Sequence, residues 1–166
     1  MNDTQAGAPV QNEQQQPPLT VVTQYLKDFS FENPAGAENL TAPQAAPTGA
    51  VKVDVRMKQL TQADIEVSLL LGVEAKSGEK VLYVAEVDYA GIFRLGRVPQ
   101  EAVMPLLTIE APRLLFPFAR NLISLATQNG GFPPLNINPI DFTLLYRQRQ
   151  EEMLRQQKQA EASAII

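Results

Sequence analysis

The sequence lacks cysteine and histidine, two side chains on which much protein chemistry depends. Without cysteine the chain forms no disulfides and performs no thiol chemistry. Without histidine it lacks the commonest general base and the commonest metal ligand at neutral pH. We therefore expect neither a metal site nor a cofactor.

Positive charge is also scarce, and so are long apolar runs. The net charge of −4 belongs to the first 50 residues, where five acids accompany one lysine. Nothing resembles the basic footprint of a nucleic-acid-binding protein. The start of the chain is no secretory signal, and no uninterrupted apolar run approaches the ~20 residues of a membrane span. We expect a soluble cytoplasmic protein that binds no nucleic acid and does not insert into a membrane.

Sequence motifs of catalysis are missing as well. The lysine nearest a turn glycine stands in the order Gly78-Glu79-Lys80, whereas a phosphate-binding loop needs Gly-Lys-Ser/Thr. There is no dinucleotide-binding glycine pattern and no nucleophile elbow. The carboxylates are scattered and indicate solvated surface charge, so we expect a protein that is not an enzyme.

Alternation of apolar and polar residues predicts a four-stranded antiparallel sheet. The first strand, 25–32, has an aromatic face and a mixed face with two acids: Tyr25, Lys27, Phe29 and Phe31 against Leu26, Asp28, Ser30 and Glu32. Three more strands follow at 51–57, 65–73 and 81–89. Their short connections imply antiparallel neighbours.

Two of these strands carry apolar residues on both faces. Leu70, Leu82 and Val84 lie opposite the regular apolar positions of 65–73 and 81–89. Helices on one side of a sheet need only one apolar face, so something else must cover the second. A second subunit and a groove for a client chain both explain the pattern, and both stay open.

Aromatic residues add to this surplus of apolar surface. Each of four phenylalanines can be ordinary core on its own, but together with the two-faced strands they indicate a groove or an interface. These are Phe93, Phe116, Phe118 and Phe132.

The stretch from Ala111 to Phe142 organises the second half of the chain. Its apolar residues recur at steps of three and four, which predicts a helix that kinks at Pro117. Gly130-Gly131 ends this helix, and Pro133-Pro134 prevents its continuation. An extended segment at 135–138 leads to a second helix that starts at Pro139. A short helix at 102–107, interrupted by Pro105, precedes the stretch.

The ends of the chain differ in character from its middle. Residues 1–18 are polar and glutamine-rich, and we expect them to be a disordered leader. Residues 19–148 form one domain, and 149–166 form a polar tail that can be helical. The fold class is α+β: a four-stranded antiparallel sheet with a long central helix and a C-terminal helix packed beside it.

Several motifs in this order resemble the SecB family of bacterial protein-export chaperones. They are KDFSFENP at 27–34, AGIF at 90–93, LLFPFAR at 114–120, GGFPPL at 130–135 and PIDF at 139–142. The resemblance covers roughly residues 23–148. It implies an ATP-independent chaperone that holds unfolded precursor proteins in apolar grooves and passes them to SecA, the translocation motor. It also implies a homotetramer built as a dimer of dimers, in the cytoplasm of a Gram-negative-type bacterium.

The resemblance further implies where SecA docks. Asp28, Glu32 and Glu79 match the acidic SecA-contact positions of the family, and SecA is expected to present a basic, zinc-bound tail to them. A rival interpretation is a structural or adaptor subunit that uses the same apolar surface only for oligomer contacts.

Overall fold

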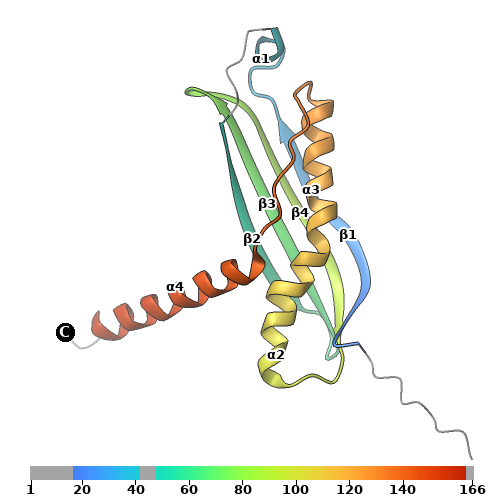
Figure 1. Ribbon diagram of the computed structural model, residues 1–166, viewed down its shortest axis with the longest axis vertical. Helices are drawn as coiled ribbons and strands as arrows, with labels where there is room; N and C mark the ends of the chain where they lie inside the picture. Colours follow the sequence, from blue (N-terminus) through green and yellow to red (C-terminus); the bar gives the residue numbers. More distant parts are fainter. Residues whose placement is uncertain (1–16, 42–47, 164–166) are drawn as a thin grey trace, which may run out of the picture.

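The computed structural model describes residues 17–41 and 48–163, so most of the predicted leader lies outside the described residues. Four long strands form one antiparallel sheet in the order β1-β4-β3-β2 (Figure 1). They are β1 (Leu19–Glu32), β2 (Thr48–Gln59), β3 (Asp64–Ser77) and β4 (Lys80–Leu95). The predicted sheet and the α+β class are confirmed. Both outer strands, β1 and β2, leave one edge without a strand partner in the described chain.

Five helical segments accompany the sheet. They are α1 (Glu38–Thr41), α2 (Gln100–Pro105), the π-helix η1 (Leu106–Glu110), α3 (Ala111–Asn129) and α4 (Phe142–Ser163). The segments α2, η1 and α3 follow one another without a break as a single rod along one face of the sheet (Figure 1). The sequence predicted two separate helices here.

The rod accommodates its prolines by changing its hydrogen bonding. Pro105 has no amide hydrogen to donate, and the helix continues beyond it with one π-turn. In this turn the Ala111 amide donates to the carbonyl of Leu106, five residues earlier. Helix α3 then runs unbroken from Ala111 through Pro117 to Asn129.

The end of α3 has the predicted glycine stop. Gly131 adopts a φ of 84°, and Gly130 before it remains helical. The Phe132 amide donates to the Thr127 carbonyl at 3.0 Å, and the Gly131 amide donates to the Gln128 carbonyl at 3.1 Å. This pair of bonds is the Schellman motif, which satisfies carbonyls that the helix end leaves free. The next helix starts at Phe142, three residues later than predicted, because Asp141 caps its first turn through the Leu144 amide at 3.0 Å.

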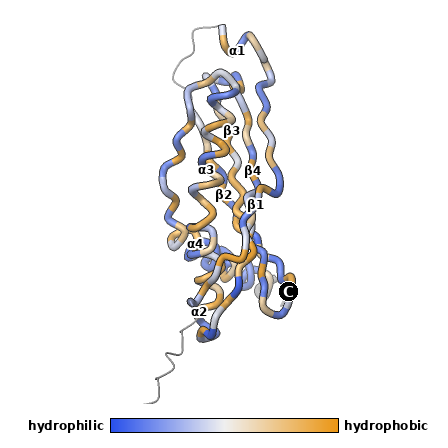
Figure 2. The backbone as a smooth tube through the Cα atoms, turned by 90° about the vertical axis from the view of Figure 1, so that its right-hand side faces the viewer, coloured by the Kyte–Doolittle hydropathy of each residue, from blue (hydrophilic) through white to orange (hydrophobic). Residues whose placement is uncertain are grey.

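The core lies between α3 and the middle of the sheet. Leu115, Ala119 and Ile123 are fully buried on the sheet-facing side of α3, against buried residues of β3 and β4 such as Leu69 and Val87. Burial of each large apolar side chain contributes about 1.5 to 3 kcal/mol. Figure 2 shows hydrophobic residues concentrated along α3 and the central strands, and hydrophilic residues along much of α4.

The rod Gln100–Asn129 is long and apolar enough, by length and composition alone, to cross a membrane. The core helix of a soluble protein passes the same test. Here Leu115, Ala119 and Ile123 pack on the sheet, so we assign the rod to the core.

Candidate functional site

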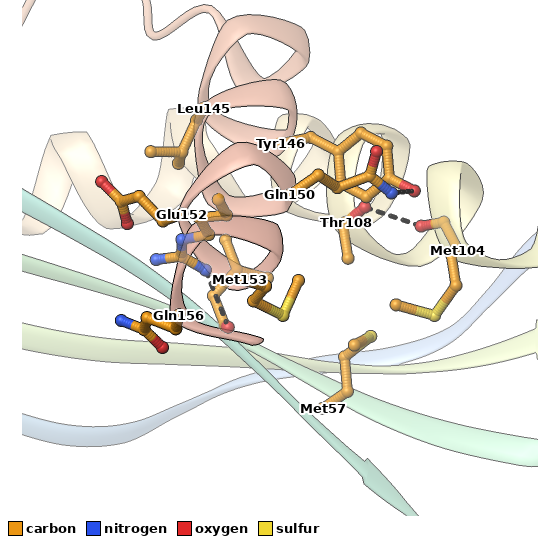
Figure 3. A pocket seen from close by; sticks show the side chains of 11 residues that line it. Met57, Met104, Thr108, Leu145, Tyr146, Gln150, Glu152, Met153 and Gln156 are labelled. Atoms are coloured by element: carbon orange, nitrogen blue, oxygen red, sulfur yellow. Dashed lines mark hydrogen bonds between the residues drawn. The ribbon is translucent and has the colours of Figure 1, made fainter. Parts of the chain in front are cut away.

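A cavity of about 360 Å³ opens where α4 crosses the edge strand β2 and the start of the rod (Figure 3). We call it the methionine pocket, because Met57, Met104 and Met153 enter it from β2, α2 and α4. Its other lining residues are Val55, Thr108, Leu145, Tyr146, Arg149, Gln150, Glu152 and Gln156. Methionine side chains are flexible and polarisable, and they adapt to partners of different shape. The pocket can therefore accommodate apolar side chains of different shapes.

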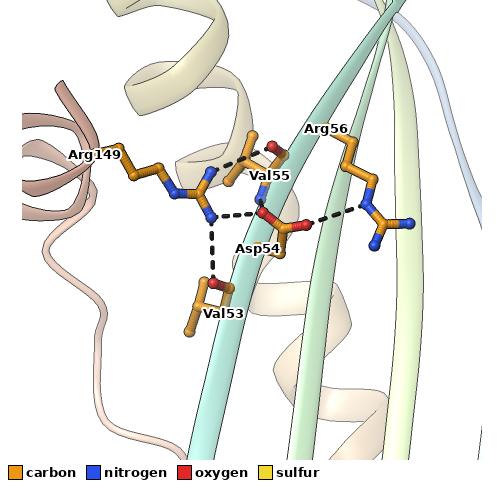
Figure 4. A network of polar contacts seen from close by, with 5 residues as sticks. All are labelled: Val53, Asp54, Val55, Arg56 and Arg149. Carbon is orange, nitrogen blue, oxygen red and sulfur yellow. Dashed lines mark hydrogen bonds and ion pairs between the residues drawn. The ribbon is translucent and has the colours of Figure 1, made fainter. Parts of the chain in front are cut away.

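Arg149 of α4 lies over the outer edge of β2 next to this pocket (Figure 4). Its guanidinium donates to the Val55 carbonyl at 3.3 Å, to the Val53 carbonyl at 3.4 Å and to a carboxylate oxygen of Asp54 at 2.6 Å. The two carbonyls belong to the backbone row that an additional strand would use for pairing. Arg149 thus occupies acceptors that an extended peptide would otherwise take.

An aromatic cluster fills the other end of the molecule, where β1, β4 and the end of α3 meet. The ring centroids of Phe31 and Tyr83 are 5.7 Å apart, and those of Tyr83 and Phe132 are 4.9 Å apart. Gly130 makes room for this cluster, because a Cβ there would collide with the Phe31 ring. Tyr83 and Phe132 are buried, so the cluster anchors the segment after α3 to the sheet.

A second apolar surface runs along the flank of α3 that adjoins β4 and β1. We call it the apolar stripe, and its α3 members are Leu114, Phe118 and Leu125, each about half exposed. The Phe118 ring stacks on Tyr89 of β4 at 5.7 Å and 12°. On neighbouring β1, exposed Val21, Leu26 and Phe29 pair with β4 residues of this same sheet face and continue the stripe. Apolar residues that recur along both elements indicate a surface that another chain covers.

The opposite face of the sheet carries the acids, because β1 contains a bulge at Lys27. Leu26 pairs with Tyr89 and Asp28 with Asp88, so Lys27 has no partner in the register. A bulge of one residue reverses which side chains point to which face. The prediction that Tyr25 shares a face with Phe29 and Phe31 is therefore wrong. Phe29 and Phe31 do lie on the helix side, as their partners Val87 and Ala85 do.

The bulge brings four acids together, and we call them the acidic face: Asp28 and Glu32 of β1 with Glu86 and Asp88 of β4. Asp28 lies directly opposite Asp88, and like charges in such pairs are destabilising. One carboxylate oxygen of Asp88 is buried without a hydrogen-bond partner in the described chain. Glu79 lies in the exposed β3–β4 turn, at the end of the sheet nearer Glu32. This arrangement favours a cationic partner.

Glu66 of β3 holds the bulge in place. Its two carboxylate oxygens accept hydrogen bonds from the Tyr25 hydroxyl and from the Lys27 ammonium, the latter at 2.5 Å. Glu66 is only 9% exposed. The bonds from Lys27 and Tyr25 hold the pKa of Glu66 below its ordinary value, and the bond to Glu66 raises the pKa of Tyr25 to about 12.

Replacing Glu66 by glutamine should lower the free energy of unfolding at pH 7 by about 1 to 3 kcal/mol, the usual worth of hydrogen bonds to a charged group. The lowered pKa means that Glu66 stabilises the fold above its unfolded pKa, and this contribution is lost as the pH falls through the folded value. Urea unfolding at pH 7 and pH 4, at one protein concentration, should therefore show a difference between variant and parent that shrinks in acid.

Glu86→Gln is the matched control, since Glu86 is an exposed acid on the same face of the sheet. If Glu86→Gln lowered the free energy of unfolding as much as Glu66→Gln does, the contacts of Glu66 with the bulge would contribute no more to stability than an exposed acid does.

The ten residues singled out from the sequence fall into different environments. Asp28 and Glu32 share the acidic face, and Leu70 and Val84 lie half-buried on this face. Glu79 lies in the exposed β3–β4 turn. Phe118 belongs to the apolar stripe. The other apolar candidates, Phe93, Phe116, Phe132 and Leu82, are buried within this chain.

Neither the methionine pocket nor the contact of Arg149 with β2 could be predicted from the sequence. Met57, Met104 and Met153 are almost 50 residues apart from one to the next, and no local pattern joins them. Among the described residues, no group of acids is arranged to hold a metal ion.

The chain resembles known proteins over most of its length. Residues 12–153 match the family model of the preprotein translocase subunit SecB. It is 48% identical over 145 residues to the protein-export protein SecB of Agrobacterium fabrum, covering 87% of this chain and 91% of that protein. It is 46% identical over 156 residues to the protein-export protein SecB of Rhizobium meliloti, covering 93% of each.

A solved structure agrees on the fold. A SecB-like chaperone of Mycobacterium tuberculosis, in complex with a peptide from an antitoxin, superposes with a TM-score of 0.63. The match covers 74% of this chain and 91% of that one at 12% identity, so it bears on the fold alone. The family model and the two close relatives decide the assignment: this chain belongs to the SecB family of protein-export chaperones.

Proposed function

We propose that this protein is an ATP-independent holdase, which keeps unfolded precursor proteins competent for export and delivers them to SecA in the cytoplasm of a Gram-negative-type bacterium. The observation that carries the proposal is an apolar, adaptable pocket placed beside an open strand edge. Unfolded chains expose apolar side chains and an unpaired backbone at the same time. Holding them requires no catalytic step, because binding the unfolded state shifts its folding equilibrium by mass action.

The pocket and the strand edge contact different parts of a client, its side chains and its backbone. Apolar side chains of an extended client enter the methionine pocket, while its backbone pairs with the outer edge of β2. Pairing at Val53 and Val55 requires Arg149 to release their carbonyls. Main-chain hydrogen bonds do not depend on the side chains of the client. Pairing with the edge of β2 therefore accounts for affinity towards many different precursors.

Self-assembly and SecA docking use the other two surfaces. The apolar stripe supports a homotetramer of about 73 kDa, four times the 18.3 kDa of the chain, built as a dimer of dimers. The acidic face, with Glu79, supports SecA docking by complementary charge. The rival function, a structural or adaptor subunit, would need the stripe but not the pocket.

A chemically denatured client diluted into buffer should scatter less light when this protein is present at a near-stoichiometric ratio. ATP should change nothing, because holding depends on binding alone. Absence of suppression across several slowly folding clients would leave only the structural or adaptor role.

A pair of variants ties the effect to the pocket. Met57→Asp with Met153→Asp should lose most of the suppression, because an apolar client segment that covers two carboxylates removes them from water, which costs free energy. Leu60→Asp should keep it, since Leu60 is a similarly exposed apolar residue outside the pocket. Equal loss in both variants would argue against the pocket as the client site.

A further inference from the structure

Three of the four methionines in the sequence converge on one cavity (Figure 3). Met57, Met104 and Met153 are 40%, 44% and 57% exposed, so solvent and small solutes reach each of them. The fourth, Met1, lies outside the described residues. Most of the chain's methionine is thus gathered at the place where α4 meets the edge strand.

The sequence contains few other side chains that react readily with an oxidant. It contains no cysteine, no tryptophan and no histidine. Methionine is therefore the side chain that a mild two-electron oxidant attacks first, and susceptibility follows exposure. Within the described residues, oxidation should therefore concentrate in the methionine pocket.

We propose that the methionine pocket is an oxidation-sensitive modification site, in which peroxide converts Met57, Met104 and Met153 to sulfoxides and thereby weakens client binding. A sulfur lone pair attacks one peroxide oxygen, the O–O bond breaks and an S–O bond forms. The leaving hydroxide takes the proton of the transferred oxygen and becomes water. Each sulfur is oxidised by two electrons, and the peroxide is reduced by two.

The modification reverses the character of the pocket. A sulfoxide is polar and a strong hydrogen-bond acceptor, whereas the thioether it replaces is apolar. An apolar client side chain that covers a sulfoxide leaves its oxygen without water, which is costly. Since β2, α2 and α4 each contribute one methionine, full oxidation places a sulfoxide on three of the elements that line the pocket. Methionine sulfoxide reductases restore the thioether, so the change is reversible.

The inference rests on the proposed holdase function, and the experiment separates the two. The full-length protein is treated with hydrogen peroxide, and mass spectrometry of peptides counts one added oxygen per methionine. Affinity for a denatured client is then measured before oxidation, after it, and after treatment with the reductases. We expect a loss of affinity of about tenfold or more, equivalent to about 1.4 kcal/mol, and recovery after reduction.

The matched variant is Met57→Leu with Met104→Leu and Met153→Leu, which keeps volume and apolar character. Its own affinity before oxidation, whatever its value, is the reference for this variant, and peroxide treatment should leave that affinity unchanged. Unchanged affinity after complete oxidation of all three methionines overturns the inference, and so does equal loss in the leucine variant. A protein that holds no client even before oxidation contradicts the proposed function instead. Rescue by the reductases tests the inference on the parent chain alone.

Discussion

Replacing Asp28, Glu32 and Glu79 together by alanine should weaken SecA binding by roughly 30-fold at low salt. Each exposed charge contributes about 0.5 to 1 kcal/mol to such an encounter, and three of them give about 2 kcal/mol. Asp28 and Glu32 lie on the acidic face, opposite the side that α3 covers, and none of the three lines the methionine pocket. Client holding and the tetramer should therefore survive. Calorimetry with purified SecA measures the first effect, and light scattering and sedimentation measure the others.

Salt and a charge-matched variant test the cause of that loss. The parent protein should lose SecA affinity as ionic strength rises, and the triple variant should lose less, because fewer charges remain to be screened. Alanine at Glu101, Glu110 and Glu151 removes the same net charge elsewhere. If this control weakened SecA equally, overall charge would be responsible. Unchanged affinity in the first variant would leave its three acids as solubilising charge.

The variant Phe118→Asp with Leu125→Asp should no longer form the tetramer. Both residues belong to the apolar stripe and are about half exposed in the single chain. A contact that covers them gains about 1.5 to 3 kcal/mol for each apolar side chain, whereas an unpaired carboxylate buried there costs several kcal/mol. Since every subunit carries both changes, sedimentation at micromolar concentration should find dimers or monomers in place of the ~73 kDa species.

Leu60→Asp serves as the control for this experiment, because Leu60 is exposed to a similar degree but lies in the β2–β3 connection. It should sediment as the parent does. A tetramer that persists with Phe118 and Leu125 both replaced would show that the stripe is not a subunit contact. A parent protein that is monomeric at micromolar concentration would contradict the assembly altogether.

Local patterns predicted the elements of the fold well. Strict alternation such as Val51, Val53 and Val55 identified the strands, because a half-buried strand repeats every two residues. Gly130-Gly131 identified the end of α3, where only glycine readily takes the φ of 84° found at Gly131. The prolines misled the prediction, since a π-turn let the helix continue beyond Pro105.

What the sequence could not predict depends on contacts between distant residues. Tyr25, Phe29 and Phe31 have one parity in the sequence, and this regularity concealed the bulge that separates Tyr25 from the others. Glu66, which holds the bulge, lies 41 residues after Tyr25. The methionine pocket likewise exists only once α4 has crossed β2. Such sites follow from tertiary packing and leave no signal in a window of ten or twenty residues.

The bulge at Lys27 makes the effect of a deletion in β1 depend on where the deletion falls. If Lys27 itself were removed, the strand would run without its bulge, with Tyr25 still opposite Ala90 and Asp28 still opposite Asp88, so every side chain would keep its face. If one residue were removed between Asp28 and Glu32, no bulge would absorb the change, and Glu32 would turn from the acidic face towards α3. A deletion at the bulge should thus preserve the separation of the acidic face from the core-facing surface, whereas a deletion a few residues later should disrupt it. Deletions in this family should accordingly be tolerated better at Lys27 than between Asp28 and Glu32.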